Sequence, residues 1–346
     1  MSVQSAGVSL RHEILSLHLR RTFATARASE DVAHTLVLRL TAGGIEALGE
    51  SAPSARYGES ADSVARDLDG IDVGGADLRH IDAALARVPA NQRGAMCALD
   101  LALHDLAAKQ LGAPLHRLLG LDPAAAKATS FTIGLADIET MLEKTREAKD
   151  LPILKVKLGG GREIETIEAL RSVYRGAIRI DANEAWQPEE AVALLRELKR
   201  FDIEFCEQPI KAGDIPWLRY VRELSPIPIF ADEDCRTLDD LRELNGFVDG
   251  VNIKLVKCGG IREAVRMIHA ARALKMKVMI GCMIESSVLA TAAAQLTPLV
   301  DYADLDGPLL ISDDPFEGVG YDGGRLVLPE APGLGVQEKT KLQVGA

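Results

Sequence analysis

The sequence has few aromatic residues and no excess of positive charge. Phe, Trp and Tyr make up 4% of its 346 residues, and 40 Lys and Arg stand against 51 Asp and Glu, which gives a net charge of −11. An acidic chain with few rings for base stacking repels phosphate backbones and anionic lipids. We therefore expect no nucleic-acid partner and no membrane-surface role, although this charge is compatible with a locally basic pocket.

Long apolar runs and paired cysteines are also missing. The longest uncharged stretch of the apolar region after Lys277 is residues 286–300, too short and too polar to span a bilayer, and the first residues lack the apolar segment of a signal peptide. Five cysteines are scattered without a Cys-x-x-Cys pair: Cys97, Cys206, Cys235, Cys258 and Cys282. This pattern predicts a reducing, cytoplasmic environment, and neither a disulfide framework nor a zinc site.

The first third of the chain predicts a small α+β domain, residues 1–122. Residues 34–40 alternate like a half-buried strand, and Gly43-Gly44 predicts a hairpin turn to a partner strand at 45–49. Helical stretches follow near residues 60–68, 76–87 and 92–110. Strands followed by helices favour an α+β arrangement. A last strand-like run at 325–329 is expected to return to this domain with the C-terminal segment of about 321–346.

Residues 123–320 differ, because short β-rich runs alternate there with amphipathic stretches. Eight such runs end near residues 132, 157, 181, 207, 232, 254, 282 and 304, at intervals of 22 to 28 residues. A doubly wound sheet also alternates, but it seldom keeps eight even steps. The regular period therefore predicts an α/β chain with a TIM-type barrel.

Ionisable side chains end the second to sixth predicted strands, where the active sites of such barrels lie. Asp181, Glu207 and Asp232 end three neighbouring strands. Three converging carboxylates repel one another unless a cation neutralises them, and hard oxygen ligands suit Mg²⁺ or Mn²⁺. We therefore expect a divalent metal site at these residues, with coordination positions left for substrate oxygen and water.

Lys157 and Lys254 end strands two and six, which lie opposite each other in a ring of eight strands. They would flank a substrate whose carboxylate is bound at the metal, and the metal charge would stabilise that carboxylate when the adjacent carbon loses a proton. One lysine would remove the proton and the other would return one to the opposite face, which inverts the stereocentre. Lys155 and the metal would lower the pKa of the base. The alternative is that both lysines only pair with the carboxylates.

Asp304 and Asp306 follow at the end of the eighth strand, across the ring from the metal ligands. Two unpaired carboxylates there predict a cationic partner, most simply a substrate ammonium. The alternative is that Asp306-Gly307-Pro308 is only a turn. Residues 159–161, three glycines between a strand and a helix, would allow phosphate binding, but a simple turn beside Lys157 is the better interpretation.

These residues together resemble the enolase superfamily, in particular its muconate-lactonizing-enzyme-like subgroup. The resemblance covers nearly the whole chain and implies a modified (β/α)7β barrel with an N-terminal α+β capping domain. Five motifs carry it in order and spacing: Lys155-Val156-Lys157, Asp181-Ala182-Asn183, Glu207-Gln208-Pro209, Ala231-Asp232-Glu233, and Asn252-Ile253-Lys254 ahead of Gly259-Gly260.

The resemblance implies a role for each of these residues. Asp181, Glu207 and Asp232 would bind Mg²⁺. Lys157 and Lys254 would be the acid–base pair, and Lys155 would support the substrate carboxylate. Asn183 and Glu233 would not bind the metal themselves but would orient the residues that bind it.

Within the subgroup, Asp304-Leu305-Asp306 looks like the Asp-x-Asp of dipeptide epimerases, which holds the substrate α-ammonium. Residues 56–60 and 281–283 resemble the L-Ala-D/L-Glu epimerases, which act on murein-derived dipeptides. In this family a flexible early loop, here about Arg21 to Arg27, closes on the substrate side chain, and Arg27 is the candidate for a side-chain carboxylate. Thr132 and Cys282, at the ends of strands one and seven, complete the expected substrate contacts.

Three residues depart from this pattern or stand outside it. Asp234 occupies a position where relatives often carry a small hydroxyl residue, and Glu285 lies just past the seventh strand; either would alter hydrogen bonding near the metal or specificity. His269, the one histidine of the barrel region, lies in a predicted helix, which argues against a His-Asp base. We expect it to be a core or surface residue.

The sequence therefore predicts a cytoplasmic, Mg²⁺-dependent dipeptide epimerase that interconverts L-Ala-L-Glu and L-Ala-D-Glu or close analogues, with a homo-oligomer possible. The first alternative is an N-succinylamino-acid racemase, an o-succinylbenzoate synthase or a muconate cycloisomerase, whose substrates lack a free ammonium for Asp304 and Asp306. The second alternative is a non-catalytic barrel that binds a metal or an anion, against which the intact Lys157 and Lys254 argue.

Overall fold

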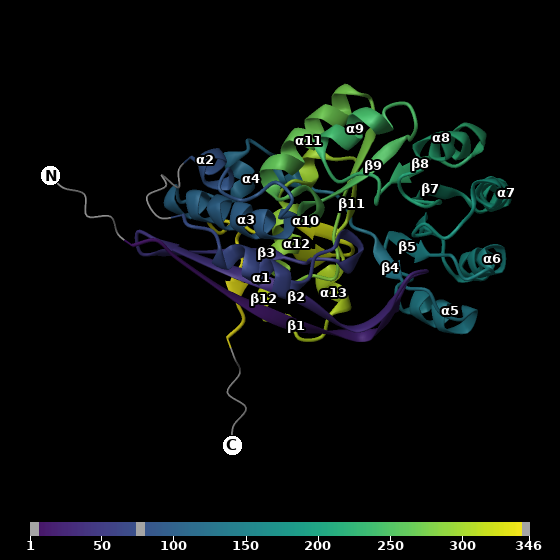
Figure 1. The fold of residues 1–346 in the computed structure, drawn as a ribbon. Helices are drawn as coiled ribbons and strands as arrows, with labels where there is room; N and C mark the ends of the chain where they lie inside the picture. Colours follow the sequence, from purple (N-terminus) through teal and green to yellow (C-terminus); the bar gives the residue numbers. More distant parts are fainter. Residues whose placement is uncertain (1–6, 74–79, 341–346) are drawn as a thin grey trace, which may run out of the picture.

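The computed structural model describes residues 7–73 and 80–340, which form an N-terminal antiparallel sheet with helices and an eight-stranded parallel sheet (Figure 1). This arrangement confirms the predicted α/β barrel with an N-terminal α+β domain. None of the helices in the described part of the chain has the length and hydrophobicity needed to cross a bilayer.

The N-terminal sheet is a meander of long strands. β1 (Ser9–Ala24), β2 (Ser29–Ala42) and β3 (Ile45–Ser51) pair in that order, antiparallel throughout. Gly43 and Gly44 have φ values of 59° and 79°, as a two-residue hairpin turn requires, so the predicted turn is confirmed. The strand β1 was not predicted from the sequence. It also takes in residues 21–24, which were expected in a loop, so that the turn is confined to residues 25–28.

Helices cover one side of this sheet. α1 (Ala61–Asp69), α2 (Ile81–Leu85) and α3 (Arg93–Gln110) confirm the three predicted helices; residues 76–79 of the second prediction lie outside the described residues. α3 packs directly on β3, where a Cβ on Gly49 would lie 1.9 Å from the Ala98 carbonyl oxygen. Only glycine allows this close approach, which fixes the helix against the sheet.

The parallel sheet runs in chain order from β4 to β11. Its strands are β4 (Phe131–Ile133), β5 (Ile153–Lys157), β6 (Ala177–Asp181), β7 (Ile203–Glu207), β8 (Ile229–Ala231), β9 (Gly250–Lys254), β10 (Lys277–Gly281) and β11 (Tyr302–Asp304). A parallel bridge between Thr129 and Ala303 joins the two edges, so the sheet closes on itself. The strand ends lie within one residue of the predicted ones.

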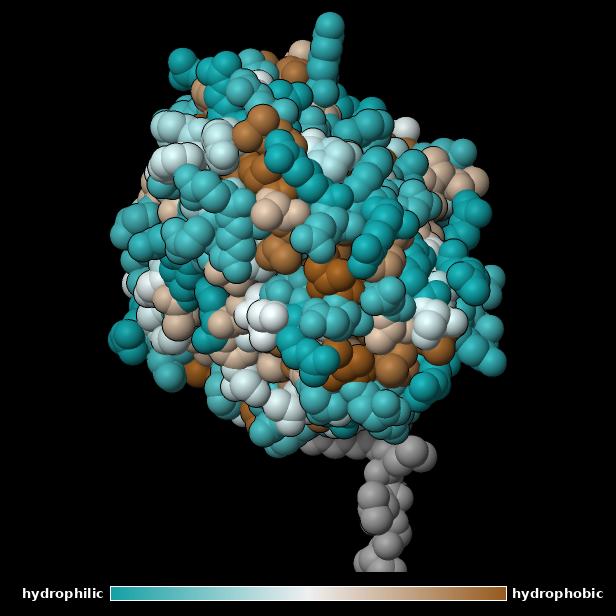
Figure 2. Space-filling view, turned by 90° about the vertical axis from the view of Figure 1, so that its right-hand side faces the viewer, coloured by the Kyte–Doolittle hydropathy of each residue, from teal (hydrophilic) through white to brown (hydrophobic). Residues whose placement is uncertain are grey.

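Helices lie outside this ring, and α5 to α8 cover its right-hand side in Figure 1. The longer ones are α5 (Ile138–Glu147), α6 (Glu163–Val173), α7 (Pro188–Leu198), α8 (Ile215–Leu224), α9 (Leu238–Leu244), α11 (Ile261–Ala273) and α12 (Ser287–Ala294); α4 (Leu115–Leu118), α10 (Leu255–Cys258) and α13 (Gly307–Leu310) are single turns. In Figure 2, which faces this side, hydrophobic residues lie in small groups between hydrophilic ones.

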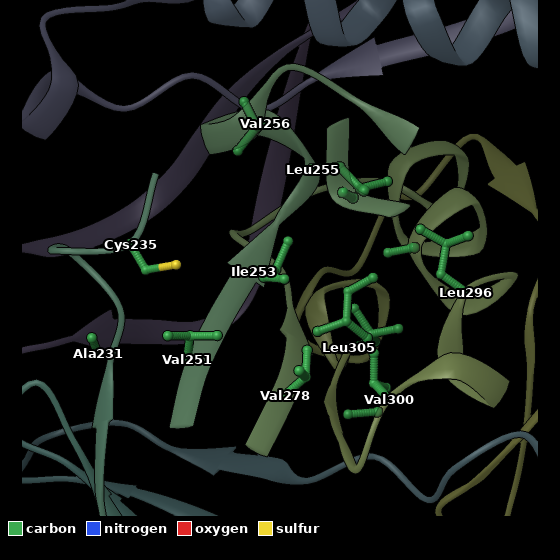
Figure 3. Close-up of a cluster of buried hydrophobic side chains, with 14 of the residues drawn as sticks. Ala231, Cys235, Val251, Ile253, Leu255, Val256, Val278, Leu296, Val300 and Leu305 are labelled. Atoms are coloured by element: carbon green, nitrogen blue, oxygen red, sulfur yellow. The ribbon is translucent and has the colours of Figure 1, made fainter. Parts of the chain in front are cut away.

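The core between strands and helices follows from strand alternation. Val251 and Ile253 of β9 and Val278 of β10 are fully buried and belong to one apolar cluster with Leu296 and Leu305 (Figure 3). The intervening residues of β9 must point to the opposite side, into the ring. The same alternation makes the Lys-x-Lys at the end of β5 two inward side chains around an outward valine.

The C-terminal segment contacts both parts of the molecule. β13 (Gly320–Asp322) and β14 (Arg325–Val327) form a hairpin whose Gly324 carbonyl accepts a hydrogen bond from Thr129 N of the barrel. Contacts with the N-terminal domain come later, where Leu334 N donates to Asp105 Oδ1 on α3. β15 (Gln337–Glu338) then pairs with β12 (Phe316–Glu317). The strand expected at 325–329 therefore lies against the barrel, and the return to the first domain begins beyond it.

Candidate active site

Three carboxylates from neighbouring strands meet at the carboxyl ends of the barrel. Asp181 ends β6, Glu207 ends β7 in register with it, and Asp232 directly follows β8. One oxygen from each carboxylate lies within 4.8 Å of the other two, and all three residues are buried. The side chains that the sequence predicted as metal ligands are therefore brought together.

Three lysines from β5 and β9 pair with these carboxylates. Lys157 Nζ lies 2.7 Å from Asp181 Oδ2, and Lys254 Nζ lies 2.9 Å from Asp232 Oδ2. Lys155 Nζ lies between the triad and Asp304, at 2.7 Å from Glu207 Oε2 and 2.8 Å from Asp304 Oδ2. Lys157 and Lys254 thus bind opposite ends of the triad.

The carboxylates of the triad differ in pKa, because repulsion between them raises a pKa and the neighbouring lysines lower it. Burial and the charge of Asp181 raise the pKa of Glu207 to about 8. Burial would also raise the pKa of Asp232, but Lys254 and Lys257 hold it well below its ordinary value. The cluster therefore carries a negative charge that only close cations stabilise.

Two acceptors beside the triad have no partner. Asn183 Oδ1 and Glu233 Oε2 are buried and accept no hydrogen bond from residues 7–73 or 80–340. Together with three buried carboxylates, these hard oxygen atoms suit a small divalent cation and the polar groups around it better than a soft metal. The donor set fits Mg²⁺ or Mn²⁺.

The backbone behind the triad is strained where it positions the carboxylates. Asn183, Glu184 and Gln208 have φ values of 45°, 70° and 36°, which side chains other than glycine rarely adopt. Asn183 N donates to Asp181 Oδ1 over 2.9 Å, and Gln208 Oε1 accepts from Asp232 N over 3.0 Å. Strain of roughly 1–3 kcal/mol per residue is typical of functional sites and is held here by these bonds.

Asp234, one of the departures from the family pattern, acts through Gln208. Its Oδ2 accepts a hydrogen bond from Gln208 Nε2 over 2.7 Å, and its Oδ1 accepts from Gly213 N over 2.7 Å. This fixes the amide orientation that presents Gln208 Oε1 to the backbone of Asp232. Asp234 therefore supports the triad residue Asp232 indirectly, through Gln208.

Two residues that the sequence reasoning left without a role complete the network. Lys257, in α10, is buried; its Nζ pairs with the Asp232 carboxylate and donates to the Asp232 and Asn252 carbonyl oxygens over 2.6 and 3.0 Å. Asn252 Nδ2 donates to Glu207 Oε1 over 2.7 Å. The spacing Lys254-x-x-Lys257 was the available signal, because a strand that runs into a helical turn brings such residues together.

Asp304 and Asp306 lie beside β4, but only one of them is free of a cation. Asp304 pairs with Lys155 and accepts from Ser130 Oγ over 2.6 Å, so it is not the unpaired carboxylate that we expected. Asp306 Oδ2 accepts from Thr132 N over 2.6 Å, and Cys282 Sγ lies 3.9 Å from Oδ1.

The environment of Asp306 does not fit a simple turn. Burial and the charge of Asp304 raise the pKa of Asp306 to about 6. Its side chain makes no capping bond to α13, which begins at the next residue, so the turn alternative does not account for the carboxylate. Asp306 is a buried acid directed at Thr132, and within residues 7–73 and 80–340 no cationic side chain pairs with it.

The N-terminal domain adds two arginines. Arg27, in the turn between β1 and β2, places Nη1 2.5 Å from Glu233 Oε1, 2.7 Å from Glu184 Oε2 and 3.3 Å from the Asn183 carbonyl oxygen. Arg56, in the short helix η1 (Ala55–Tyr57), also binds Glu184. Arg27 therefore lies on the Asn183 side of the site, where it pairs with Glu184 and Glu233.

A cavity of about 540 Å³ joins the two parts of the molecule. Its barrel side is lined by Lys155, Lys157, Lys254, Asp304 and Asp306, and its other side by the N-terminal domain from Phe23 to Ala61. This volume is within the usual range for small-molecule sites. The cavity therefore connects Asp232 of the triad, the three lysines and Asp306 in one space.

Two further expectations were resolved nearby. The glycine run at 159–161 does not offer its amides to a phosphate, because Glu163 Oε1 accepts from Gly159 N and Gly161 N over 3.1 and 3.0 Å. Glu285 is buried and accepts from Met283 N over 3.0 Å; burial and the charge of Glu50 raise its pKa well above the ordinary value. Neither feature brings a ligand to the site.

Comparisons with known proteins agree with this geometry. A family model described as enolase C-terminal domain-like matches residues 137–341, and one for the mandelate racemase / muconate lactonizing enzyme N-terminal domain matches residues 10–120. An L-Ala-D/L-amino acid epimerase of Maribacter sp. is 38% identical over 93% of this chain and 96% of its own length. An L-Ala-D/L-Glu epimerase of Bacteroides thetaiotaomicron is 38% identical over 93% of this chain and 86% of its own length.

Solved structures show the same architecture. The substrate-liganded L-Ala-D/L-Glu epimerase from Bacillus subtilis superposes with a TM-score of 0.91 and 29% identity, covering 95% of this chain and 98% of that one. A dipeptide epimerase from Cytophaga hutchinsonii, complexed with Mg and D-Ala-L-Val, gives 0.90 and 29%, over 97% and 96%. An N-succinyl Arg/Lys racemase from Bacillus cereus gives 0.90 and 27%, over 97% and 96%. The chain therefore belongs to the enolase superfamily, and the two relatives from Maribacter and Bacteroides are epimerases.

Proposed function

We propose that the protein is a Mg²⁺-dependent dipeptide epimerase that inverts the α-carbon of the C-terminal residue, with L-Ala-L-Glu and L-Ala-D-Glu as the preferred pair. The carrying observation is the position of Lys157 and Lys254, which bind opposite ends of one buried carboxylate triad. Two amines at the two ends of a shared ion site are suited to reach opposite faces of one carbon atom.

The triad and Lys155 would hold the substrate carboxylate. Asp181, Glu207 and Asp232 would bind the divalent cation, Mg²⁺ or Mn²⁺, which supplies the positive charge that makes the adjacent α-proton acidic. Asn183 and Glu233 would orient these ligands from behind. Lys155 already lies 2.7 Å from Glu207 and would neutralise the carboxylate as negative charge moves onto it.

Lys157 and Lys254 would transfer the proton. Each must act once as a neutral amine and once as an ammonium. Burial would lower the pKa of Lys254, but the carboxylate of Asp232 raises it above the ordinary value. When Asp232 serves as a metal ligand, its negative charge is shared, and the proton on Lys254 is held less strongly.

Asp306, supported by Asp304, would bind the α-ammonium of the dipeptide. Asp306 is a buried carboxylate of the cavity wall without a cationic partner among the described residues, while Asp304 is already paired with Lys155. Thr132 and Cys282 line the same corner, and Arg27 would face a substrate side-chain carboxylate. N-succinyl amino acids, o-succinylbenzoate precursors and muconate have no α-ammonium for Asp306, which favours dipeptides over the alternatives of the same architecture.

Proton exchange tests this proposal. Incubation of the protein with Mg²⁺ and L-Ala-L-Glu in D₂O should add one mass unit at the α-carbon of the glutamate and produce the L,D epimer, and EDTA should stop both. The Lys157→Met and Lys254→Met variants are the matched controls, since neither can complete inversion. Exchange with N-succinyl amino acids but with no dipeptide would replace the proposal by the racemase alternative, and no exchange with either would favour a non-catalytic binding barrel.

We further propose a cytoplasmic protein that acts on peptides released from the cell wall. All five cysteines are free thiols and four of them are buried, which suits a reducing compartment. A symmetric homo-oligomer is also proposed. Light scattering on the purified protein and fractionation of cells that express it would test these two points.

A further inference from the structure

The loop that joins β10 to α12 runs along the cavity beside Lys254. Cys282, Met283 and Ile284 of this loop line the cavity wall. Met283 Sδ lies 3.9 Å from Lys254 Nζ, close enough for the thioether to accept weakly from the ammonium. Lys254 Nζ also pairs with Asp232 Oδ2 over 2.9 Å. The ammonium is therefore held between a carboxylate and a neutral thioether that belongs to the cavity wall.

Lys157, the other lysine that is proposed to move the proton, lacks a contact of this kind. Its Nζ donates to Asp181 Oδ2 over 2.7 Å, and residues 7–73 and 80–340 offer it no second hydrogen-bond or ion-pair partner. A lysine side chain has several rotatable bonds, and ordering it costs conformational entropy. A wall contact that restricts Lys254 would lower this cost when the amine has to meet the α-carbon.

The start of the loop is fixed to β11 and to α13. Cys282 N donates to the Asp304 carbonyl oxygen over 3.0 Å. A Cβ on Gly307 would lie 2.9 Å from the Met283 carbonyl oxygen, so the glycine lets α13 pack closely on the loop. Met283 N donates to Glu285 Oε2 over 3.0 Å. The backbone of Met283 is thus held from both sides.

The end of the loop is bound by Glu50, a fully buried carboxylate on β3 of the N-terminal domain. Its Oε1 accepts from Ser286 N over 3.0 Å, and its Oε2 accepts from Ser286 Oγ and Leu289 N over 2.6 and 2.9 Å. Ser286 is the N-cap of α12, where backbone amides attract negative charge. The next residue, Ser287, instead binds Asp314 of the C-terminal segment through N and Oγ. Glu50 therefore ties the last residue of the loop to the N-terminal domain.

We propose that Met283 is a positioning residue for Lys254, and that Glu50 keeps Met283 in place through Ser286. The inference rests on the proposed function, in which Lys254 moves a proton at one face of the α-carbon. The thioether is uncharged and binds weakly, so it directs the side chain of Lys254 without trapping the ammonium. The N-terminal domain then acts on the reaction from behind the cavity wall, through a loop of the barrel.

The test measures α-proton exchange of L-Ala-L-Glu and of L-Ala-D-Glu separately, in D₂O with Mg²⁺. Lys157→Met and Lys254→Met first show which epimer each lysine deprotonates. The kcat/KM values of epimerisation cannot serve, because a fixed equilibrium constant makes both directions fall by the same factor. The two exchange rates are free to differ, so their ratio reports on one lysine relative to the other.

Met283→Ala removes the contact with Lys254. The exchange rate of the epimer that Lys254 deprotonates should fall by about tenfold or more, through kcat rather than KM, because a slightly misplaced base reacts much more slowly. Exchange of the other epimer, through Lys157, should stay close to that of the unchanged protein, but more of it should end without inversion. Met283→Leu keeps most of the side-chain volume and should recover most of the lost rate.

Loss of the bond between Glu50 and Ser286 should give the same asymmetry. Ser286→Ala removes one donor to Glu50 and should lower exchange through Lys254 by about threefold, and Glu50→Gln should lower it further. Ser286→Ala should add little to Met283→Ala, because both act through one contact. Ser287→Ala is the matched control: it removes a hydroxyl at the same helix end that is bound to the C-terminal segment, and it should leave the exchange ratio unchanged.

The outcomes separate this inference from the proposed function. No loss in Met283→Ala, or an equal loss for both epimers, would overturn the positioning role and leave the epimerase intact. An asymmetry in Met283→Ala that Ser286→Ala and Glu50→Gln both lack would overturn the role of Glu50. If neither epimer exchanges in the unchanged protein, the proposed function fails and the inference fails with it. Circular dichroism confirms folding, and Ser286→Ala keeps the role of Glu50 testable if Glu50→Gln does not fold.

Discussion

At each end of the carboxylate triad one aspartate pairs with two lysines. The two ends differ in which oxygens of the aspartate the lysines bind. At one end Asp181 meets Lys155 and Lys157, both at the same oxygen, Oδ2. At the other end Asp232 meets Lys254 at Oδ2 and Lys257 at Oδ1. Each end therefore has one lysine that is proposed to move the proton, Lys157 or Lys254, and one companion lysine.

The companions show what the difference means. Lys155 is shared among Asp181, Glu207 and Asp304 and lines the cavity, so it is available to a ligand. Lys257 instead uses its remaining hydrogens on backbone carbonyl oxygens and is not part of the cavity wall. The companion at the Asp181 end therefore faces the cavity, whereas the companion at the Asp232 end is bound to the backbone of the barrel. Substitutions at the two ends should therefore fail in different ways.

Replacement of the two lysines that are proposed to move the proton should give the largest effect. Lys157→Met and Lys254→Met should each lower the rate of epimerisation by about 10³-fold or more, because a general acid–base group is lost. Each variant should still exchange the α-proton of one epimer, and the retained epimer should differ between them. Mass spectrometry of L-Ala-L-Glu and L-Ala-D-Glu in D₂O measures this. Retention of the same epimer by both variants would show that the lysines act on one face.

Replacement of Lys257 should damage stability more than chemistry. Lys257→Met leaves a buried carboxylate with one cation fewer and takes the ammonium donor away from two backbone carbonyl oxygens, so the free energy of unfolding should fall by roughly 3–5 kcal/mol. Urea denaturation with EDTA present measures this, with Lys149→Met on the exposed surface as the control. An unchanged midpoint would mean that the second end is no more fixed than the first.

The smallest of the three expected effects is a pH dependence of the KM, which the titration of Asp306 should cause. Its pKa is about 6, and only the ionised form accepts from an ammonium in the proposed complex. Below pH 6 the KM for a dipeptide should therefore rise by about tenfold per pH unit. Asp306→Asn should have a high KM without this acidic limb. A limb that persists in the variant would belong to another group.

The raised pKa of Asp306 also affects folding stability, and there the pH dependence has the opposite direction. The folded pKa of Asp306, about 6, lies above the ordinary value of 3.8, so the folded state holds this proton more tightly than the unfolded chain. Its contribution to stability is then fully present below pH 3.8 and is lost as the pH rises through 6. Binding improves over the range in which this contribution is lost.

The strand ends could be predicted from the sequence because each repeat of a strand and a helix adds one strand to the barrel. A regular period in the sequence therefore indicates where each strand ends. Asp181, Glu207 and Lys254 end strands whose limits are set by local alternation, and neighbouring parallel strands place their ends side by side. Convergence therefore needed no knowledge of loops. The family resemblance then supplied the roles of these residues.

The features that escaped prediction depend on contacts between distant loops or on side-chain reach. Arg56 and Glu184 are 128 positions apart and meet only because the N-terminal domain lies over the barrel mouth. Lys155 pairs with Asp304 because its long side chain spans from β5 to β11, which strand order alone does not reveal. β1 was missed because its side chains are largely exposed and show no clear apolar face.

The division of labour between the two layers has a practical consequence for protein engineering. The groups proposed to move the proton lie on barrel strands, whereas Arg27 and Arg56 come from a turn and a single helical turn of the N-terminal layer. Under the proposed function, exchange of those two short segments for those of a relative would change which peptide is accepted without altering any group that moves the proton. New substrate ranges could thus be explored with a library confined to fewer than ten codons.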